Sequence, residues 1–147
     1  MANIAKRTEE TLKYNELLKD RKIEEATVTN AISYATCTTS ADLNAKAIIS
    51  FTTSGHTARM VSKFRPQCPI IATTEDEGVM RRLALVWGVY PVKTSHVGNT
   101  DDLFTTSIAS AKEKNYLENG DLVVITAGVP SGISGTTNLI KVHTIEE

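Results

Sequence analysis

The feature that most limits the fold of this chain is an alternation of short apolar runs with helix-like segments. Five runs are typical of β-strands, at residues 45–51, 69–75, 88–94, 121–127 and 137–145. Helical patterns separate the first four of them, at residues 57–64, 76–87 and 100–119. Continuous apolar strands that alternate with helices indicate a parallel sheet covered on both faces. We therefore expect an α/β fold with three layers, α/β/α, around a five-stranded sheet.

The last strand should run against the other four. The segment that joins it to the preceding strand is rich in glycine and too short for a helical crossover. Strands joined so closely pair antiparallel. The sheet is therefore expected to be mostly parallel, with an antiparallel last strand. Ahead of the first strand, the pattern predicts two helices, over residues 3–20 and 23–43.

Composition and charge narrow the class of function. The chain has 147 residues, of which 41% are hydrophobic and 22% charged, as in a soluble domain. A net charge of −1 provides no broad basic field, so we expect neither nucleic acid nor a membrane surface as a partner. No apolar stretch reaches the roughly 20 residues that span a bilayer, and the N-terminus lacks the apolar core of a signal peptide. We expect a cytoplasmic protein.

Cys37 and Cys68 are too few for a disulfide framework. They also lack the spacing of a zinc site, so no metal site is predicted.

One candidate site is the stretch SFTTSGHTARMV, Ser50 to Val61, where a strand passes directly into a helix. In open α/β sheets, ligands bind beyond the carboxyl ends of the strands, where the next helix offers free N–H groups and about half a positive charge. Gly55 would let the backbone approach an anion, and the hydroxyl groups could donate hydrogen bonds. The alternative is a simple helix cap without a ligand. The predicted phosphate-binding residues are Thr52, Thr53, Ser54, Gly55, His56 and Thr57.

The second candidate is the glycine-rich stretch TAGVPSGISGTTN, Thr126 to Asn138, which follows another strand. Its glycine spacing does not fit a dinucleotide-binding loop. It could wrap over a ligand or simply form a hairpin, and the first reading gains weight if both loops lie at one edge of the sheet. We find no nucleophile–base set, so no catalytic residue is predicted, which argues against a free-standing enzyme acting on a small phosphorylated metabolite.

Longer stretches resemble a known family. The run TTSGHTARMVSKFRPQCPIIATTEDEGVMRRLALVWGVYPV is similar to the C-terminal domain of bacterial-type pyruvate kinase, and so is NGDLVVITAGVPSGISGTTNLIKVH. The upstream MANIAKRTEETLKY resembles the segment that leaves the catalytic barrel of that enzyme. The resemblance covers essentially the whole chain. It implies that residues 1–22 leave the barrel and that residues 23–147 form the C-terminal domain.

The resemblance also implies what this chain does and lacks. The family's enzymes transfer a phosphoryl group from phosphoenolpyruvate to ADP, giving pyruvate and ATP. Their active site, with its Mg and K ions, lies in an upstream barrel and lid domain, so this chain alone is expected to be inactive and to bind no cofactor. In some bacterial relatives a further domain follows. The resemblance implies that this domain binds a phosphorylated effector in the loop matching Thr52–Thr57 and helps to assemble a tetramer. It also implies that the glycine-rich loop, here Gly132, Ser134 and Gly135, closes over the effector and completes the predicted site. The expected partners are therefore the effector, the enzyme's own barrel and further copies; a purely structural oligomerisation domain is the alternative.

The chain departs from the best-known pattern at one point. Animal and yeast relatives that respond to fructose 1,6-bisphosphate carry a Trp and an Arg near the helix after the third strand, and that Arg contacts the second phosphate. The matching stretch here is NTDDLFTT, with Phe104 about where the Arg would be and no Trp. Ligands with one phosphate are therefore favoured, such as ribose 5-phosphate, AMP, glucose 6-phosphate, or plain phosphate or sulfate.

Overall fold

The fold is known from a computed structural model that describes residues 1–21 and 25–147. Six helices are found in these ranges: α1 (Ala2–Glu10), α2 (Tyr14–Asp20), α3 (Val28–Asp42), α4 (His56–Lys63), α5 (Glu77–Leu83) and α6 (Thr100–Glu113). The five strands are β1 (Ala47–Phe51), β2 (Ile70–Thr74), β3 (Val89–Lys93), β4 (Leu122–Ala127) and β5 (Leu139–Thr144). None of the helices in the described ranges is long and apolar enough to cross a membrane.

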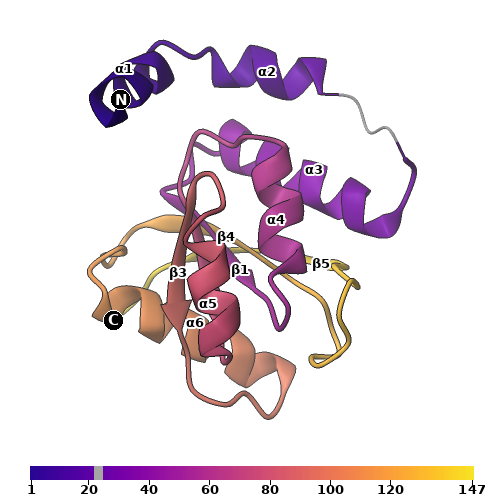
Figure 1. Cartoon of the computed structure of the whole chain (residues 1–147). Helices are drawn as coiled ribbons and strands as arrows, with labels where there is room; N and C mark the ends of the chain where they lie inside the picture. Colours follow the sequence, from indigo (N-terminus) through magenta and orange to yellow (C-terminus); the bar gives the residue numbers. More distant parts are fainter. Residues whose placement is uncertain (22–24) are drawn as a thin grey trace.

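The strands form one sheet in the order β3-β2-β1-β4-β5 (Figure 1). The pairs β1–β2, β2–β3 and β1–β4 are parallel, and β4–β5 is antiparallel. The predicted α/β class, the five strands and the antiparallel last strand are therefore confirmed. Because β1 and β4 are parallel neighbours, Ser50 lies opposite Thr126, and the two loops that follow these strands leave from the same edge.

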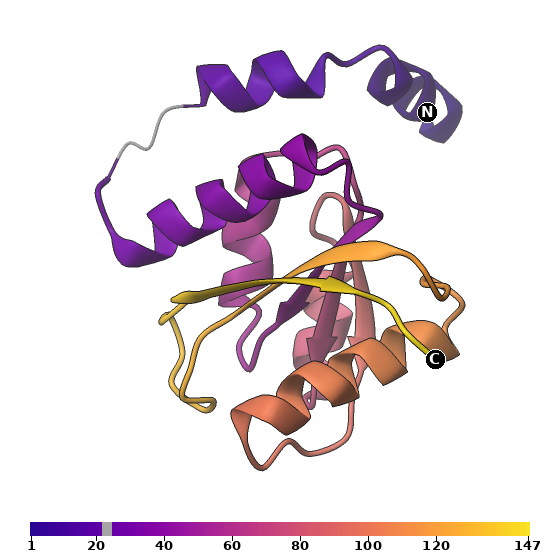
Figure 2. The ribbon, with the colours of Figure 1, turned by 180° about the vertical axis from the view of Figure 1, so that it is seen from behind.

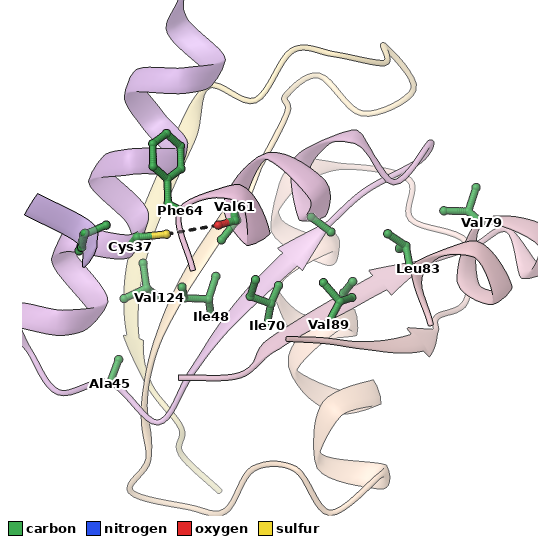
Figure 3. Packing of buried hydrophobic residues seen from close by; sticks show 13 residues of the cluster. Cys37, Ala45, Ile48, Val61, Phe64, Ile70, Val79, Leu83, Val89 and Val124 are labelled. Carbon is green, nitrogen blue, oxygen red and sulfur yellow. Dashed lines mark hydrogen bonds between the residues drawn. The ribbon is translucent and has the colours of Figure 1, made fainter. Parts of the chain in front are cut away.

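The sheet separates two main apolar clusters. On one face, Ile48, Ile70 and Val124 pack against side chains of α3, α4 and α5 (Figure 3). On the other face, Ile49, Ile71 and Ile125 pack against α6, which is seen from behind in Figure 2. The side chains of successive residues in one strand thus point to opposite faces of the sheet, as strand geometry requires. β1 and β2 are buried along their whole length, which explains their continuous apolar runs.

The N-terminal segment differs from the single predicted helix over residues 3–20, because α1 ends at Glu10 and α2 begins at Tyr14. The hydroxyls of Thr8 and Thr11 donate to the carbonyls of Ile4 and Thr8, at 2.8 Å each. Such side-chain bonds compete with the helical pattern. No residue of α1 is buried, so little tertiary packing opposes the break.

Three helix boundaries also differ from the prediction. The helix expected from Ile23 begins at Val28, because the Thr27 side chain caps it by accepting from the N–H of Asn30 at 3.2 Å. Ile23 and the expected domain boundary between residues 22 and 23 lie outside the described residues. The other two helices end early, at Leu83 and Glu113. Asn115, two residues after the end of α6, has a φ of +59°. A positive φ cannot continue a right-handed helix.

Candidate anion site at the carboxyl edge of the sheet

The two loops singled out from the sequence lie together in the structure. Residues 52–55 join β1 to α4, and residues 128–138 join β4 to β5. Both leave the carboxyl ends of neighbouring parallel strands, and they lie side by side in Figures 1 and 2. The carboxyl edge of an open sheet is where such folds bind ligands. The condition that both loops lie at one edge of the sheet is therefore met, which favours a second loop that covers a ligand over a simple hairpin.

The loop between β1 and α4 depends on Gly55. This residue has a φ of +87°, and its N–H donates to the Thr52 Oγ1 at 2.8 Å. A side chain at position 55 would be strained by the positive φ, and its Cβ would lie 3.3 Å from the Leu83 Cδ2, which would have to shift slightly. Gly55 is also the N-cap residue of α4, and no side chain of the described ranges caps that helix. The hydroxyl groups of this loop therefore do not form the plain Ser/Thr helix cap that was the alternative to an anion site.

The loop between β4 and β5 is held by close backbone contacts. A Cβ at Gly128 would lie 2.5 Å from the carbonyl oxygen of Thr136, so only glycine lets the two strands of the loop approach. The Asn138 side chain bridges the loop, accepting from the Val129 N–H at 2.9 Å and donating to the Val129 carbonyl at 2.7 Å. The base of the loop is therefore fixed, while Gly132 and Gly135 at its tip take positive φ values of 94° and 81°.

Two hydroxyl pairs join the loops across 80 residues of sequence. Ser54 Oγ lies 2.7 Å from Ser134 Oγ at the surface, and Thr57 Oγ1 lies 2.7 Å from Thr137 Oγ1 in the interior. In addition, the Thr29 hydroxyl of α3 donates to the Gly135 carbonyl at 3.2 Å. Each group in these pairs can donate and accept, so it can exchange its partner for a ligand oxygen.

The predicted residues take unequal places in this arrangement. Thr52 and Thr57 are buried, Thr53 is exposed, and Ser54 and His56 are half-buried. His56 lines a narrow cavity of about 10 Å³ between the loops, together with Ser54, Ser134 and Gly135. Sequence reasoning missed Thr137, the partner of Thr57, and Thr136, which lines the cavity, although both lie within the quoted loop. It also missed Thr29, whose contact no local pattern signals.

A carboxylate helps to order the neighbouring loop at the same edge. Glu75 follows β2 and accepts hydrogen bonds from His96 Nδ1 at 3.0 Å and from the Val97 N–H at 2.9 Å. Partial burial alone would raise the pKa of Glu75, but the bonds from His96 and Val97 and the charge of the imidazolium together hold it below its usual 4.5. The loop after β3 is thus tied to the end of β2.

Phe104 does not supply a cation at the predicted second anchor point. Its half-buried ring packs beside Phe51, Leu103 and Ala127, and the Lys141 Nζ lies 4.6 Å from the ring centroid. In residues 1–21 and 25–147, no three His, Cys, Asp or Glu side chains gather in a metal-binding arrangement.

Cys37 is fully buried. Its burial, and secondarily the nearby Cys68, raise the pKa of its thiol, so this thiol stays protonated at neutral pH.

Comparison with known proteins identifies relatives over the whole chain. Residues 30–143 match the family described as "Pyruvate kinase, alpha/beta domain". The chain is 48% identical to pyruvate kinase of Clostridium acetobutylicum over 147 residues, which covers 99% of this chain and 31% of that protein. It is 47% identical to pyruvate kinase of Geobacillus stearothermophilus, with 100% and 25% covered. The chain thus spans about a quarter to a third of the length of these relatives. Since the match covers most of the chain and agrees with its fold, the chain belongs to the pyruvate kinase family and corresponds to its C-terminal alpha/beta domain.

Proposed function

We propose that this chain is the effector-binding part of a pyruvate kinase and that a phosphate group binds between its two carboxyl-edge loops. The observation that carries the proposal is the pair of hydroxyl–hydroxyl contacts, Ser54–Ser134 and Thr57–Thr137, at the N-terminus of α4. Hydroxyl and backbone N–H donors with a favourable helix dipole are what a phosphate requires. The enzyme would transfer a phosphoryl group from phosphoenolpyruvate to ADP in the cytoplasm, using an active site outside the residues present here.

Binding would require the loops to move apart. The cavity of about 10 Å³ is too small for a phosphate, since one water alone needs roughly that volume. Phosphate oxygens would replace the Ser134 and Thr137 hydroxyls as partners of Ser54 and Thr57. His56, which lines the same cavity, would add a positive charge when protonated.

The ligand class follows from the surroundings of the site. Phe104 packs in an apolar cluster, so it provides no charge for a second phosphate. A ligand with one phosphate fits this arrangement: a sugar phosphate, a nucleoside monophosphate, or inorganic phosphate or sulfate. The glycine-rich tip, Gly132 to Gly135, would cover the remainder of the ligand. Effector binding that favours one state of a tetramer would then change substrate affinity in the catalytic barrel.

A thermal-shift titration tests this proposal. The chain would be titrated with phosphate, AMP, ribose 5-phosphate, glucose 6-phosphate and fructose 1,6-bisphosphate. A ligand at about 100 times its Kd stabilises the fold by about 2.7 kcal/mol, which raises Tm by roughly 5–10 °C. Ser54→Ala and Thr57→Ala should abolish the shift, whereas the matched exposed control Thr8→Ala should retain it.

Two results would contradict the effector role. One is the absence of a shift with all five ligands, both for this chain and for a full-length relative. The other is a shift that persists unchanged in both site variants, since the ligand would then bind elsewhere. A shift found only with full-length enzyme would mean that the site is completed by the assembly.

An assembly role is the second candidate, and one observation favours it. β5 is an edge strand, and its Val142 side chain is 43% exposed. Unpaired strand edges readily pair with a second chain. Sedimentation velocity should show self-association that Val142→Lys abolishes. Val28→Lys, at an exposed position of α3, should leave it unchanged. A monomer at all concentrations would exclude self-association of this chain.

A further inference from the structure

A second cavity, of about 340 Å³, lies away from the carboxyl-edge loops and gathers aromatic side chains. Its walls include Tyr14, Trp87, Tyr90 and Tyr116. The chain has only four tyrosines and one tryptophan, so three of the tyrosines and the sole tryptophan lie in this one place.

The cavity is built from the amino ends of two strands and from the N-terminal helices. Pro69 and Gly88 directly precede β2 and β3, and Tyr90 lies on β3. The rings form two tilted pairs, Tyr14 with Trp87 at 6.3 Å and Tyr90 with Tyr116 at 5.8 Å between centroids. Tyr90 remains 48% exposed, so its ring is accessible to a ligand rather than enclosed in the core.

One charged residue of the described ranges lines the cavity directly. Among the lining residues of the described ranges, Glu9 is the only charged side chain, and its Oε1 accepts from the Trp87 Nε1–H at 2.9 Å. Burial, followed by the negative charge of Glu9, raises the pKa of Tyr14, so this ring keeps its proton near neutrality. The Trp87 ring already accepts one cation: the Arg65 guanidinium lies 4.8 Å from its centroid, although Arg65 does not line the cavity.

We propose that this cavity binds a small organic ammonium cation, held by the aromatic rings and by the carboxylate of Glu9. Ring faces attract cations within about 6 Å of the centroid, and alkylated ammonium groups are bound in this way by aromatic cages. A cavity of 340 Å³ is of the size that takes a small ligand. An anionic ligand is disfavoured, because it would meet the carboxylate and the negative faces of the rings.

The test compares two probes of nearly equal shape. Choline carries a quaternary nitrogen, and 3,3-dimethyl-1-butanol replaces that nitrogen with carbon. Because Trp87 is the only tryptophan, its fluorescence reports on this cavity alone. At constant ionic strength, choline should change the emission saturably, and the neutral probe should bind at least about tenfold more weakly.

Two variants locate the binding. Glu9→Gln and Tyr90→Leu should each weaken choline binding by about 3- to 30-fold, the range expected for one lost cation contact. Both side chains are exposed, so circular dichroism should show an unchanged fold. Glu10→Gln, the neighbouring exposed carboxylate that does not line the cavity, is the matched control and should bind choline normally.

Three outcomes would overturn the proposal. Equal affinity for the neutral probe would show an apolar cavity without cation selectivity. An equal loss in Glu9→Gln and Glu10→Gln would show only a general charge effect. No saturable response to choline would exclude the site outright. Because choline carries no phosphate, each of these results is independent of whether the carboxyl-edge loops bind a phosphate group.

Discussion

Two cavities of this domain lie at opposite ends of the parallel part of the sheet and are built in opposite ways. The anion site follows the carboxyl ends of β1 and β4 and consists of hydroxyl groups, glycines and a helix N-terminus. The aromatic cavity lies at the amino ends of β2 and β3 and is lined by four rings, one carboxylate and the turn at residues 66–69. The first has a volume of about 10 Å³ and the second about 340 Å³.

The difference follows from the direction of the strands. Carboxyl ends of parallel strands lead into helix N-termini, whose free N–H groups favour anions. The amino ends lack such N–H groups, so recognition there depends on side chains. Ligand binding at the proposed anion site should therefore depend on backbone geometry, whereas binding in the aromatic cavity should depend on the identity of the side chains.

The largest effect is expected from Gly128→Ala. The added Cβ would lie 2.5 Å from the Thr136 carbonyl oxygen, so the base of the loop must shift. We expect a loss of about 2–3 kcal/mol in the free energy of unfolding, measured with urea, and loss of the phosphate response. Gly98→Ala is the matched control, because nothing lies within 4 Å of the added atom, and it should change stability by less than about 0.5 kcal/mol. Normal phosphate binding by Gly128→Ala would show that loop geometry is unimportant.

A smaller effect is expected from Thr57→Val, which removes one hydroxyl of the buried pair. The Thr137 hydroxyl would then be buried without its partner, at a cost of about 1–3 kcal/mol. The double variant Thr57→Val with Thr137→Val should recover most of that loss, because both polar groups are gone. Urea unfolding of the four proteins in this cycle gives the coupling. The choline response should be the same in all four, and additive losses would contradict the pairing.

The smallest effect concerns pH and Glu75. The pKa of this carboxyl is lowered in the folded protein, so its contribution to stability is fully present above the unfolded value of about 4.5 and is lost as pH falls through the folded value. Glu75→Gln should therefore reduce stability near neutral pH slightly and flatten the acid limb of the profile below about pH 4.5. Urea unfolding from pH 3 to 7 measures this. Glu113→Gln, at an exposed site on α6, should keep the wild-type slope.

Much of the fold could be predicted because it depends on patterns within short stretches of the sequence, such as apolar runs and loop length. The runs around Ile48 and Ile70 are continuous and apolar, and the strands that contain them are buried on both faces. The antiparallel last strand followed from the short loop before it. Helix ends were less predictable: the break at Thr11 to Lys13 depends on hydroxyl bonds to single carbonyls. The periodicity of apolar residues does not report such bonds.

The proposed anion site could be located in part from the sequence, because one of its two segments is also contiguous. Thr52 to Thr57 form one uninterrupted stretch, so their residue types point to an anion without further information. Their partners Ser134 and Thr137 are 80 residues away and are brought close only by the pairing of β1 with β4. The aromatic cavity left no pattern at all, since Glu9, Trp87 and Tyr116 belong to separate elements.

The sequence alone determined the α/β class, the antiparallel last strand and the family, because these depend on apolar periodicity, loop length and contiguous motifs. Only the tertiary structure decided that hydroxyl groups distant in the sequence pair, that Gly128 must lack a side chain, and that four rings and one carboxylate line the same cavity. Each of these is a contact between residues far apart in the chain. Such contacts are set by the packing of the sheet and helices as a whole.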